Sequence, residues 1–304
     1  MANAIFTTKR LPSYDDLPEE RYHFPKRYLR AALQTVGDWI IYYEPRREDS
    51  SPNGTAGKSA YFAAARVNQI TEDTQKSGHF YAWLSEYIEF PVSVSFKHQS
   101  FYLESSLMKS DGSTNKGAFR ISVRLLPRHE YDLIIKLGFP QESLPLEHSS
   151  TVQAVADDVA EYNVLRNRIL TERSARDIAF SRSIQNIYQS TCAFTGLQII
   201  NGGGRCEIEA AHIRPVADGG PDSSRNGIAL SRTIHWMFDR GLVSLTDEGE
   251  ILASKKHLPE PILRILNPSK RAILPADPAQ RPHQVFLRHH REAVCQGKQL
   301  ELIA

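Results

Sequence analysis

The stretch from Cys192 to Leu245 constrains the fold of this 304-residue chain more than any other part of its sequence. It reads CAFTGLQIINGGGRCEIEAAHIRPVADGGPDSSRNGIALSRTIHWMFDRGLVSL. Two runs of strand-forming residues, EIEAAHI and IALS, enclose a loop that contains glycine and serine, and RTIHWMFD follows with apolar residues at helical spacing. The predicted order of strand, loop, strand and helix places His212 at a strand end, Asn226 across the loop and His235 on the helix.

These three side chains suit metal-assisted hydrolysis of a phosphodiester. Such hydrolysis needs a base that deprotonates the attacking water and a cation that neutralises charge on the phosphate and the leaving oxygen. We expect His212 to be the base, because an imidazole titrates near neutral pH. We expect Asn226 to orient the loop and the His212 ring, and His235 to hold the metal ion.

The same residues carry a resemblance to a known family. Asn226, eight intervening residues and His235, preceded by AAHIRP, resemble the HNH or ββα-metal nuclease motif. The flanking CAFTG and FDRGLVSL resemble a bacterial HNH subfamily. The resemblance implies that His212 is the general base, Asn226 the orienting asparagine and His235 the metal ligand, with one Mg²⁺ or Mn²⁺ ion in each site.

One position departs from the family pattern. Many members carry an Asp or His immediately before the base as a second metal ligand, and this chain has Ala211 there. Asp239, four residues after His235 on the same helical face, is the best replacement, with a hydrogen bond at the helix end as its alternative role. Glu209 is a weaker candidate that depends on the twist of its strand.

The length suits two domains of about 150 residues each. Upstream of a break near 140–155, short aromatic and β-branched runs such as DWIIYYEP and FPVSVSF alternate with polar stretches, which predicts a mainly β domain, a barrel. Apolar residues at spacings of three and four then indicate an amphipathic helix. We predict an α+β chain with a reader domain at 1–150, a helical linker at 151–190 and the nuclease domain, with flanking helices, at 191–304.

The first half resembles the EVE-like branch of the PUA superfamily, through GDWIIYYEPRR, AYFAAARVNQI, GHFYAWLSEYIEFPVSV and FRISVRLL. This resemblance implies a β-barrel that reads modified or flipped bases. Such a reader holds the base between aromatic rings, and Trp39, Tyr43 and Trp83 are the candidates for that pocket. Strand alternation puts Trp39 and Tyr43 on one face and Tyr42 on the other, and most of these rings are expected in the core.

Four arginines are candidates for phosphate contacts. Arg46 and Arg47 follow the aromatic strand, whereas Arg166 and Arg173 share a face of the predicted linker helix, where an ordinary solvated surface is an equal alternative. The net charge of +2 by itself decides nothing about nucleic acid.

An EVE-like reader joined to an HNH nuclease resembles the modification-dependent restriction endonucleases, which implies double-stranded DNA with modified cytosine as substrate. We favour 5-hydroxymethylcytosine over 5-methylcytosine, because a site built for a hydroxyl rejects its absence strongly. The alternatives are a catalytically inactive reader and an RNA-directed nuclease that uses the 2′-hydroxyl. We expect a homodimer, because one HNH site nicks one strand.

Composition limits the location of the chain. No apolar run approaches the roughly 20 residues that span a bilayer, and the first residues, MANAIFTTKRLPSYDDLPEE, lack the apolar core of a signal peptide. We therefore expect a cytoplasmic protein that does not enter the membrane. The three cysteines form no C-x-x-C pair and are expected to be free thiols.

Overall fold

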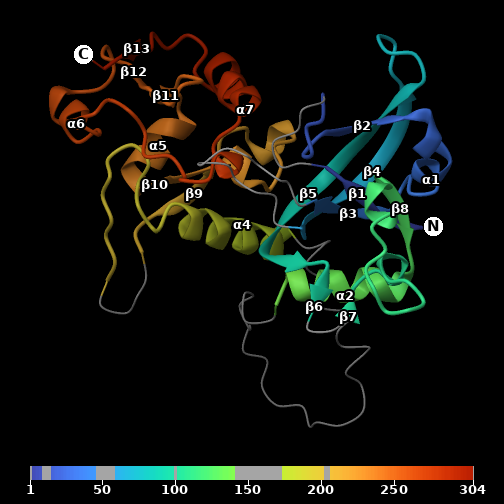
Figure 1. Cartoon of the computed structure of the whole chain (residues 1–304). Helices are drawn as coiled ribbons and strands as arrows, with labels where there is room; N and C mark the ends of the chain where they lie inside the picture. The colour runs from blue at the N-terminus through green and yellow to red at the C-terminus, as the bar shows by residue number, and fades with distance from the viewer. Residues whose placement is uncertain are drawn as a thin grey trace. The chain divides into compact units, whose positions relative to one another are not determined.

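The computed structural model describes residues 2–8, 15–45, 59–98, 101–140, 173–201 and 206–303. The chain divides into two units, Met1–Ala179 and Phe180–Ala304, and the division lies within the range predicted as the linker. Both units combine helices and strands (Figure 1). No helix in the described ranges is long and apolar enough to cross a membrane.

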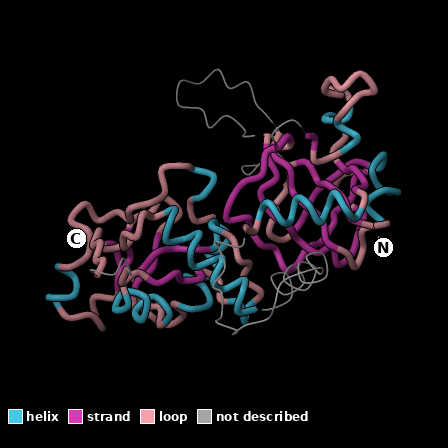
Figure 2. Tube along the Cα trace, turned by 90° about the horizontal axis from the view of Figure 1, so that it is seen from below, coloured by secondary structure: helices cyan, strands magenta, loops and turns pink. Residues whose placement is uncertain are grey.

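The first unit is built on a six-stranded sheet with the strand order β2-β5-β4-β3-β1-β8. These strands are β1 (Asn3–Thr7), β2 (Arg21–Pro25), β3 (Trp39–Glu44), β4 (Ala60–Glu72), β5 (His79–Ser95) and β8 (Val123–Leu126). β1 and β3 are parallel, and the other neighbours are antiparallel. The pairing of β4 with β5 shifts register at three points, and such bulges bend strands. The sheet is curled into a half-barrel (Figure 2) with β2 and β8 at its two ends.

Each face of this sheet carries its own apolar core. The remaining elements are η1 (Lys26–Tyr28), α1 (Leu29–Leu33), β6 (Lys97–His98), β7 (Phe101–Tyr102), η2 (Ser105–Leu107), η3 (Ala118–Arg120) and α2 (Arg128–Gly138). On one face, Tyr42 packs with Ala32 of α1. On the other, Tyr43 packs with Ile134 and Ile135 of α2. The predicted alternation of Tyr42 and Tyr43 is confirmed.

The second unit contains a hairpin, a helix and a three-stranded sheet. Its elements are α4 (Arg173–Ile187, which begins in the first unit), β9 (Glu209–His212), η5 (Val216–Asp218), η6 (Ser224–Asn226), β10 (Gly227–Leu230), α5 (Arg232–Asp239), β11 (Val243–Leu245), β12 (Ile251–Ala253), α6 (Glu260–Arg264), η7 (Pro278–Gln280), α7 (Gln284–His289), the π-helix η8 (His290–Val294) and β13 (Glu301–Leu302). β11, β12 and β13 pair in that order. The predicted helix RTIHWMFD is α5.

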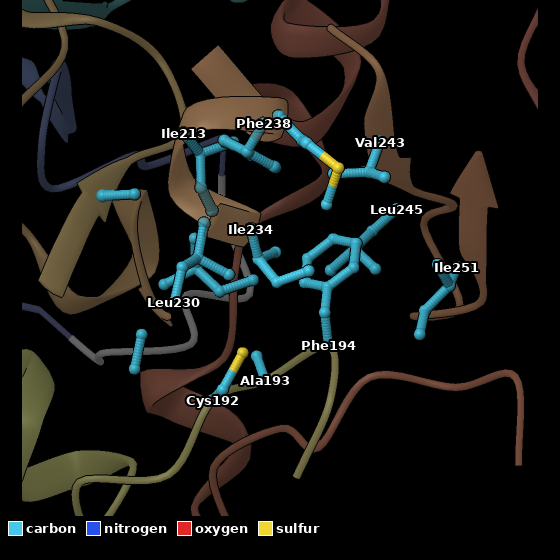
Figure 3. Close-up of a cluster of buried hydrophobic side chains, with 14 of the residues drawn as sticks. Cys192, Ala193, Phe194, Ile213, Leu230, Ile234, Phe238, Val243, Leu245 and Ile251 are labelled. Carbon is cyan, nitrogen blue, oxygen red and sulfur yellow. The ribbon is translucent and has the colours of Figure 1, made fainter. Parts of the chain in front are cut away.

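A continuous apolar core holds the second unit together (Figure 3). Ile234, Met237 and Phe238 of α5 are buried in it, and they follow the helical spacing read from the sequence. Phe194 packs edge-on against Phe238, with ring centroids 6.1 Å apart. Because α5 buries this stripe, its opposite side faces outward with the polar residues.

A buried histidine, His290, connects the C-terminal helices to this core by hydrogen bonds and ring stacking. His290 Nε2 donates to the backbone oxygen of Phe238 at 3.0 Å, and its Nδ1 accepts from Ser244 Oγ at 2.9 Å. The ring stacks on Phe238 with centroids 3.7 Å apart. Burial lowers the pKa of His290 to about 4, and the neighbouring His289 and Arg291 charges add to this lowering. The imidazole is therefore neutral at pH 7.

The three cysteines are free, as predicted.

Candidate active site

The hairpin of β9 and β10 positions two of the three predicted catalytic side chains. The strands are antiparallel, with His212 directly opposite Gly227. A Cβ atom at Gly227 would lie 2.2 Å from Cδ1 of Ile184 in α4, so a side chain here would have to displace Ile184. Helix α4 therefore packs directly on the hairpin at the level of His212.

The ring of His212 is held from two directions. Its Nε2 atom lies 3.0 Å from Oδ1 of Asp222. The ring of Phe180 stacks on it, with centroids 3.9 Å apart and an interplanar angle of 12°. The side chain of His212 keeps 18% of its surface exposed, which leaves it accessible to a water molecule or a substrate. A fixed and partly exposed imidazole is what a general base requires.

Asn226 is fully buried and spans the loop between the strands. Its Oδ1 accepts from the Arg214 backbone N–H at 2.8 Å, and its Nδ2 donates to the backbone oxygens of Arg214 and Pro221 at 3.1 and 3.0 Å. Gly220 has no room for a Cβ, which would lie 1.9 Å from the Arg214 oxygen. The amide thus closes the two ends of the loop that carries Asp222.

His235 lies on α5 between two carboxylates. Glu209 of β9 places Oε2 at 2.9 Å from Nδ1 of His235, and Asp239 places Oδ2 at 3.5 Å from Nε2. The other oxygen of Glu209 accepts from Nε of Arg232 at 3.1 Å. Glu209 therefore holds the ring through one nitrogen and turns the other nitrogen toward Asp239.

The pair of His235 and Asp239 fits a divalent cation. Metal–ligand distances of roughly 2.0–2.2 Å put two adjacent ligands of one ion roughly 3–3.5 Å apart, which matches the 3.5 Å between these atoms. Among the described residues, no group of three or more His, Cys, Asp or Glu side chains is arranged to hold a metal ion. Mg²⁺ usually keeps several waters and takes one or two carboxylates together with substrate phosphates, and Asp239 would supply such a carboxylate.

The outward side of α5 carries an exposed tryptophan beside His235. Trp236 is 53% exposed, and the guanidinium carbon of Arg240 lies 4.2 Å from its ring centroid. Arg240 also donates to the backbone oxygen of Trp236 at 3.3 Å. The helix thus presents an aromatic and a cationic group next to the candidate metal ligands, and these two groups suit nucleic acid.

The three aromatic residues predicted to line a base pocket have different surroundings. Tyr43 is buried, with its ring centroid 5.2 Å from that of Tyr61, which is the environment of a core residue. Trp39 is half-buried at the edge of the same core. Trp83 is half-buried on β5, and its indole N–H donates to Oγ1 of Thr71 at 2.8 Å. An open pocket would therefore use Trp39 and Trp83 without Tyr43.

The four arginines predicted to contact phosphate lie at or beyond the limits of the described structure. Arg46, Arg47 and Arg166 are outside the described residues. Arg173 is the first residue of α4.

Two residues at the site were missed by the sequence analysis. Asp222 stands in PDSS, a run that reads as a turn, and nothing in its spacing marks it as a partner of His212. Phe180 lies in the predicted linker helix, where an apolar residue is ordinary. A signal for Asp222 was its place in the loop that joins the two strands of the motif.

Comparison with known proteins identifies this region. The HNH endonuclease family model (HNH_2) matches residues 192–246, which confirms the HNH resemblance. The chain therefore carries an HNH endonuclease domain and is a nuclease. Nucleases of this family are generally metal-dependent. No curated protein matches the chain.

Solved structures of two restriction endonucleases are similar to this chain. The "Modification dependent TagI restriction endonuclease" is 13% identical, with 99% of this chain and 84% of that chain covered and a TM-score of 0.34. The "Type IV phosphorothioation-dependent restriction endonuclease ScoMcrA" is 15% identical, with 77% of this chain and 46% of that chain covered and a TM-score of 0.22.

Proposed function

We propose that this nuclease is a modification-dependent restriction endonuclease. Its first unit would read modified cytosine in double-stranded DNA, and its HNH domain would hydrolyse the backbone of that DNA. The observation that carries the hydrolytic part of the proposal is the arrangement in one hairpin and helix: His212 is held by Asp222, Asn226 closes the loop that carries Asp222, and His235 faces Asp239. The reading of modified cytosine rests on the resemblance of the first half to EVE-like domains. We take 5-hydroxymethylcytosine as the favoured base, 5-methylcytosine as the second, and a homodimer as the cutting species.

In the hydrolysis, each residue has one task. His212 takes a proton from the attacking water, and Asn226 keeps the loop closed around that base. His235 and Asp239 would hold one Mg²⁺ or Mn²⁺ ion, with Glu209 orienting the His235 ring. The bound cation supplies neutralisation of charge on the scissile phosphate and the leaving oxygen.

The outward side of α5 would hold the strand that is cut. A backbone that reaches His235 would pass beside Trp236, the next residue of α5, and Arg240, the residue that follows the helix. Arginine binds phosphate, and an exposed aromatic ring stacks on a sugar or base without choosing a sequence. Arg46, Arg47, Arg166 and Arg173 are proposed as further phosphate contacts.

The reader surface would lie on the sheet of the first unit. Arg66 on β4 stands opposite Trp39 on β3 and opposite Ser85 on β5. Because directly paired residues share a face, and Trp83 is two residues from Ser85, both tryptophans lie on one face with Arg66 between them. Aromatic rings and a polar group are the side chains that a reader of a flipped cytosine uses. We propose that residues 1–150 form the EVE-like or PUA-like reader, residues 151–190 the linker and residues 191–304 the nuclease domain.

The test is a digestion of three matched duplexes that contain cytosine, 5-methylcytosine or 5-hydroxymethylcytosine, with an RNA of the same sequence as a fourth substrate. Each is incubated with Mg²⁺, with Mn²⁺ and with EDTA. We expect metal-dependent cutting of the modified duplexes, fastest for 5-hydroxymethylcytosine. Equal cutting of all three duplexes would contradict the reader, and preferential cutting of RNA would contradict DNA as the substrate.

A further inference from the structure

Asp222 contacts the candidate base but has no task in the hydrolysis described above. Its Oδ1 lies 3.0 Å from Nε2 of His212, and both side chains are largely buried, at 11% and 18% exposure. An ionised carboxylate only accepts hydrogen bonds, so the proton of this bond belongs to Nε2. In a neutral imidazole with hydrogen on Nε2, the lone pair is on Nδ1.

The other ring nitrogen is available for chemistry. Nδ1 of His212 makes no hydrogen bond within the described part of the chain, because the ring's bond to Asp222 is made by Nε2. The side chain of His212 keeps 18% of its surface exposed. The stacked ring of Phe180 fixes the plane of the imidazole, and a half-turn of that ring would break the bond to Asp222. The two contacts together present Nδ1 in one orientation.

The loop geometry keeps the carboxylate in place. Asp222 follows Pro221, whose backbone oxygen accepts from Nδ2 of Asn226 at 3.0 Å. That same amide is bonded to both backbone groups of Arg214 at the other end of the loop. Asn226 therefore acts on His212 through the loop and Asp222. A fixed carboxylate costs little reorganisation when charge develops on the ring.

We propose that Asp222 is a positioning residue that sets the Nε2–H tautomer of His212 and makes Nδ1 the atom that accepts the proton. The proposal rests on the proposed role of His212 as base. In the step, a proton moves from the attacking water to Nδ1, and the oxygen forms a bond to phosphorus as the bond from phosphorus to the 3′ oxygen breaks. The 3′ oxygen leaves with the bonding pair and takes a proton from solvent. The Asp222 carboxylate remains ionised and stabilises the imidazolium.

Two substitutions separate this role from a merely structural one. Asp222→Asn preserves size and a polar contact, but its amide can donate to Nε2 and so favours the opposite tautomer. Asp222→Ala removes the contact. The matched control is Asp218→Asn, which removes the same charge from the same loop at a carboxylate that faces His289 at 3.4 Å. Melting curves establish that each variant is folded.

The measurements are the single-turnover cleavage rate with saturating Mn²⁺, the Kd for DNA with Ca²⁺ in place of Mn²⁺, and ¹⁵N NMR of the His212 ring. We expect Asp222→Asn and Asp222→Ala to lower the rate by about 10²–10⁴-fold with Kd changed less than about threefold. Wild-type His212 should show hydrogen on Nε2, and Asp222→Asn should lose that signature. Asp218→Asn should cut at the wild-type rate.

Different outcomes overturn different statements. If His212→Ala still cuts, the base in the proposed function is wrong. If His212→Ala is inactive but Asp222→Asn cuts at the wild-type rate, only the role of Asp222 fails, because a polar group of the right size is then enough. Hydrogen on Nδ1 in wild-type protein would also overturn the proposal, and that reading does not depend on activity.

Discussion

Oε2 of Glu209 lies 2.9 Å from Nδ1 of His235, although 26 residues separate them in the sequence. The sequence makes Glu209 a weaker candidate than Asp239 for the second metal ligand, which many family members supply at the position of Ala211. Glu209 contacts Nδ1, whereas Asp239 contacts Nε2, the other ring nitrogen. We propose that Glu209 orients the histidine, while Asp239 faces the nitrogen that would bind the ion.

Substitution of Glu209 by Ala should weaken the metal site. Loss of a carboxylate that holds a ligating histidine typically lowers metal affinity by about 10- to 100-fold. We expect the Mn²⁺ concentration for half-maximal cleavage to rise by that factor, with the rate at saturating Mn²⁺ reduced less. Glu250→Gln is the control, because Glu250 has a similar exposure and pairs with Arg271. An unchanged Mn²⁺ requirement in Glu209→Ala would contradict this role.

Substitution of Asn226 should destabilise the second unit. Asn226→Ala leaves two backbone oxygens and one backbone N–H without their partner in a buried setting, at a cost of about 2–4 kcal/mol. Asn226→Asp should cost at least as much above pH 5, because an oxygen would then face two carbonyl oxygens. Urea unfolding measures both. Asn186→Ala, on the exposed surface of α4, should change stability by less than about 0.5 kcal/mol.

Arg240→Ala should weaken DNA binding without a change of sequence preference. A phosphate contact contributes about one unit to the slope of log K against log salt, so we expect that slope to fall by about one. Binding titrations at several salt concentrations, with Ca²⁺ in place of the catalytic ion, measure it. Arg264→Ala on α6 removes an exposed arginine that pairs with Glu260, and it should leave the slope unchanged. Equal slopes for Arg240→Ala and wild type would place the DNA elsewhere.

Stability should fall in acid because of His290. Its pKa lies near 4 in the folded chain, below the ordinary 6.5, so the unfolded chain binds this proton first. The contribution of His290 to stability is complete above pH 6.5 and decreases as the pH falls toward 4, by about 3 kcal/mol in total. Urea unfolding between pH 4 and 7 measures it. His290→Gln should flatten this dependence, whereas His289→Gln should retain it.

Features that depend on neighbours in the chain were predicted from the sequence. The apolar stripe of α5 appears in RTIHWMFD, and an interval of four residues puts His235 and Asp239 on one side of that helix. Alternation likewise separated Tyr42 from Tyr43. Backbone geometry repeats every 3.6 residues in a helix and every two in a strand, so these relationships follow from sequence intervals alone.

Features that depend on packing between distant segments required the tertiary structure. Phe180 on His212, Asp222 on the same ring and Glu209 on His235 are contacts that no interval in the sequence specifies. The same holds for Tyr43, which α2 covers, since alternation selects a face but not what packs against it. The sequence by itself determined the types of the candidate catalytic side chains and the elements that carry them. Long-range packing decided which atoms of those side chains make hydrogen bonds and which do not. These contacts depend on where loops and helices meet in space.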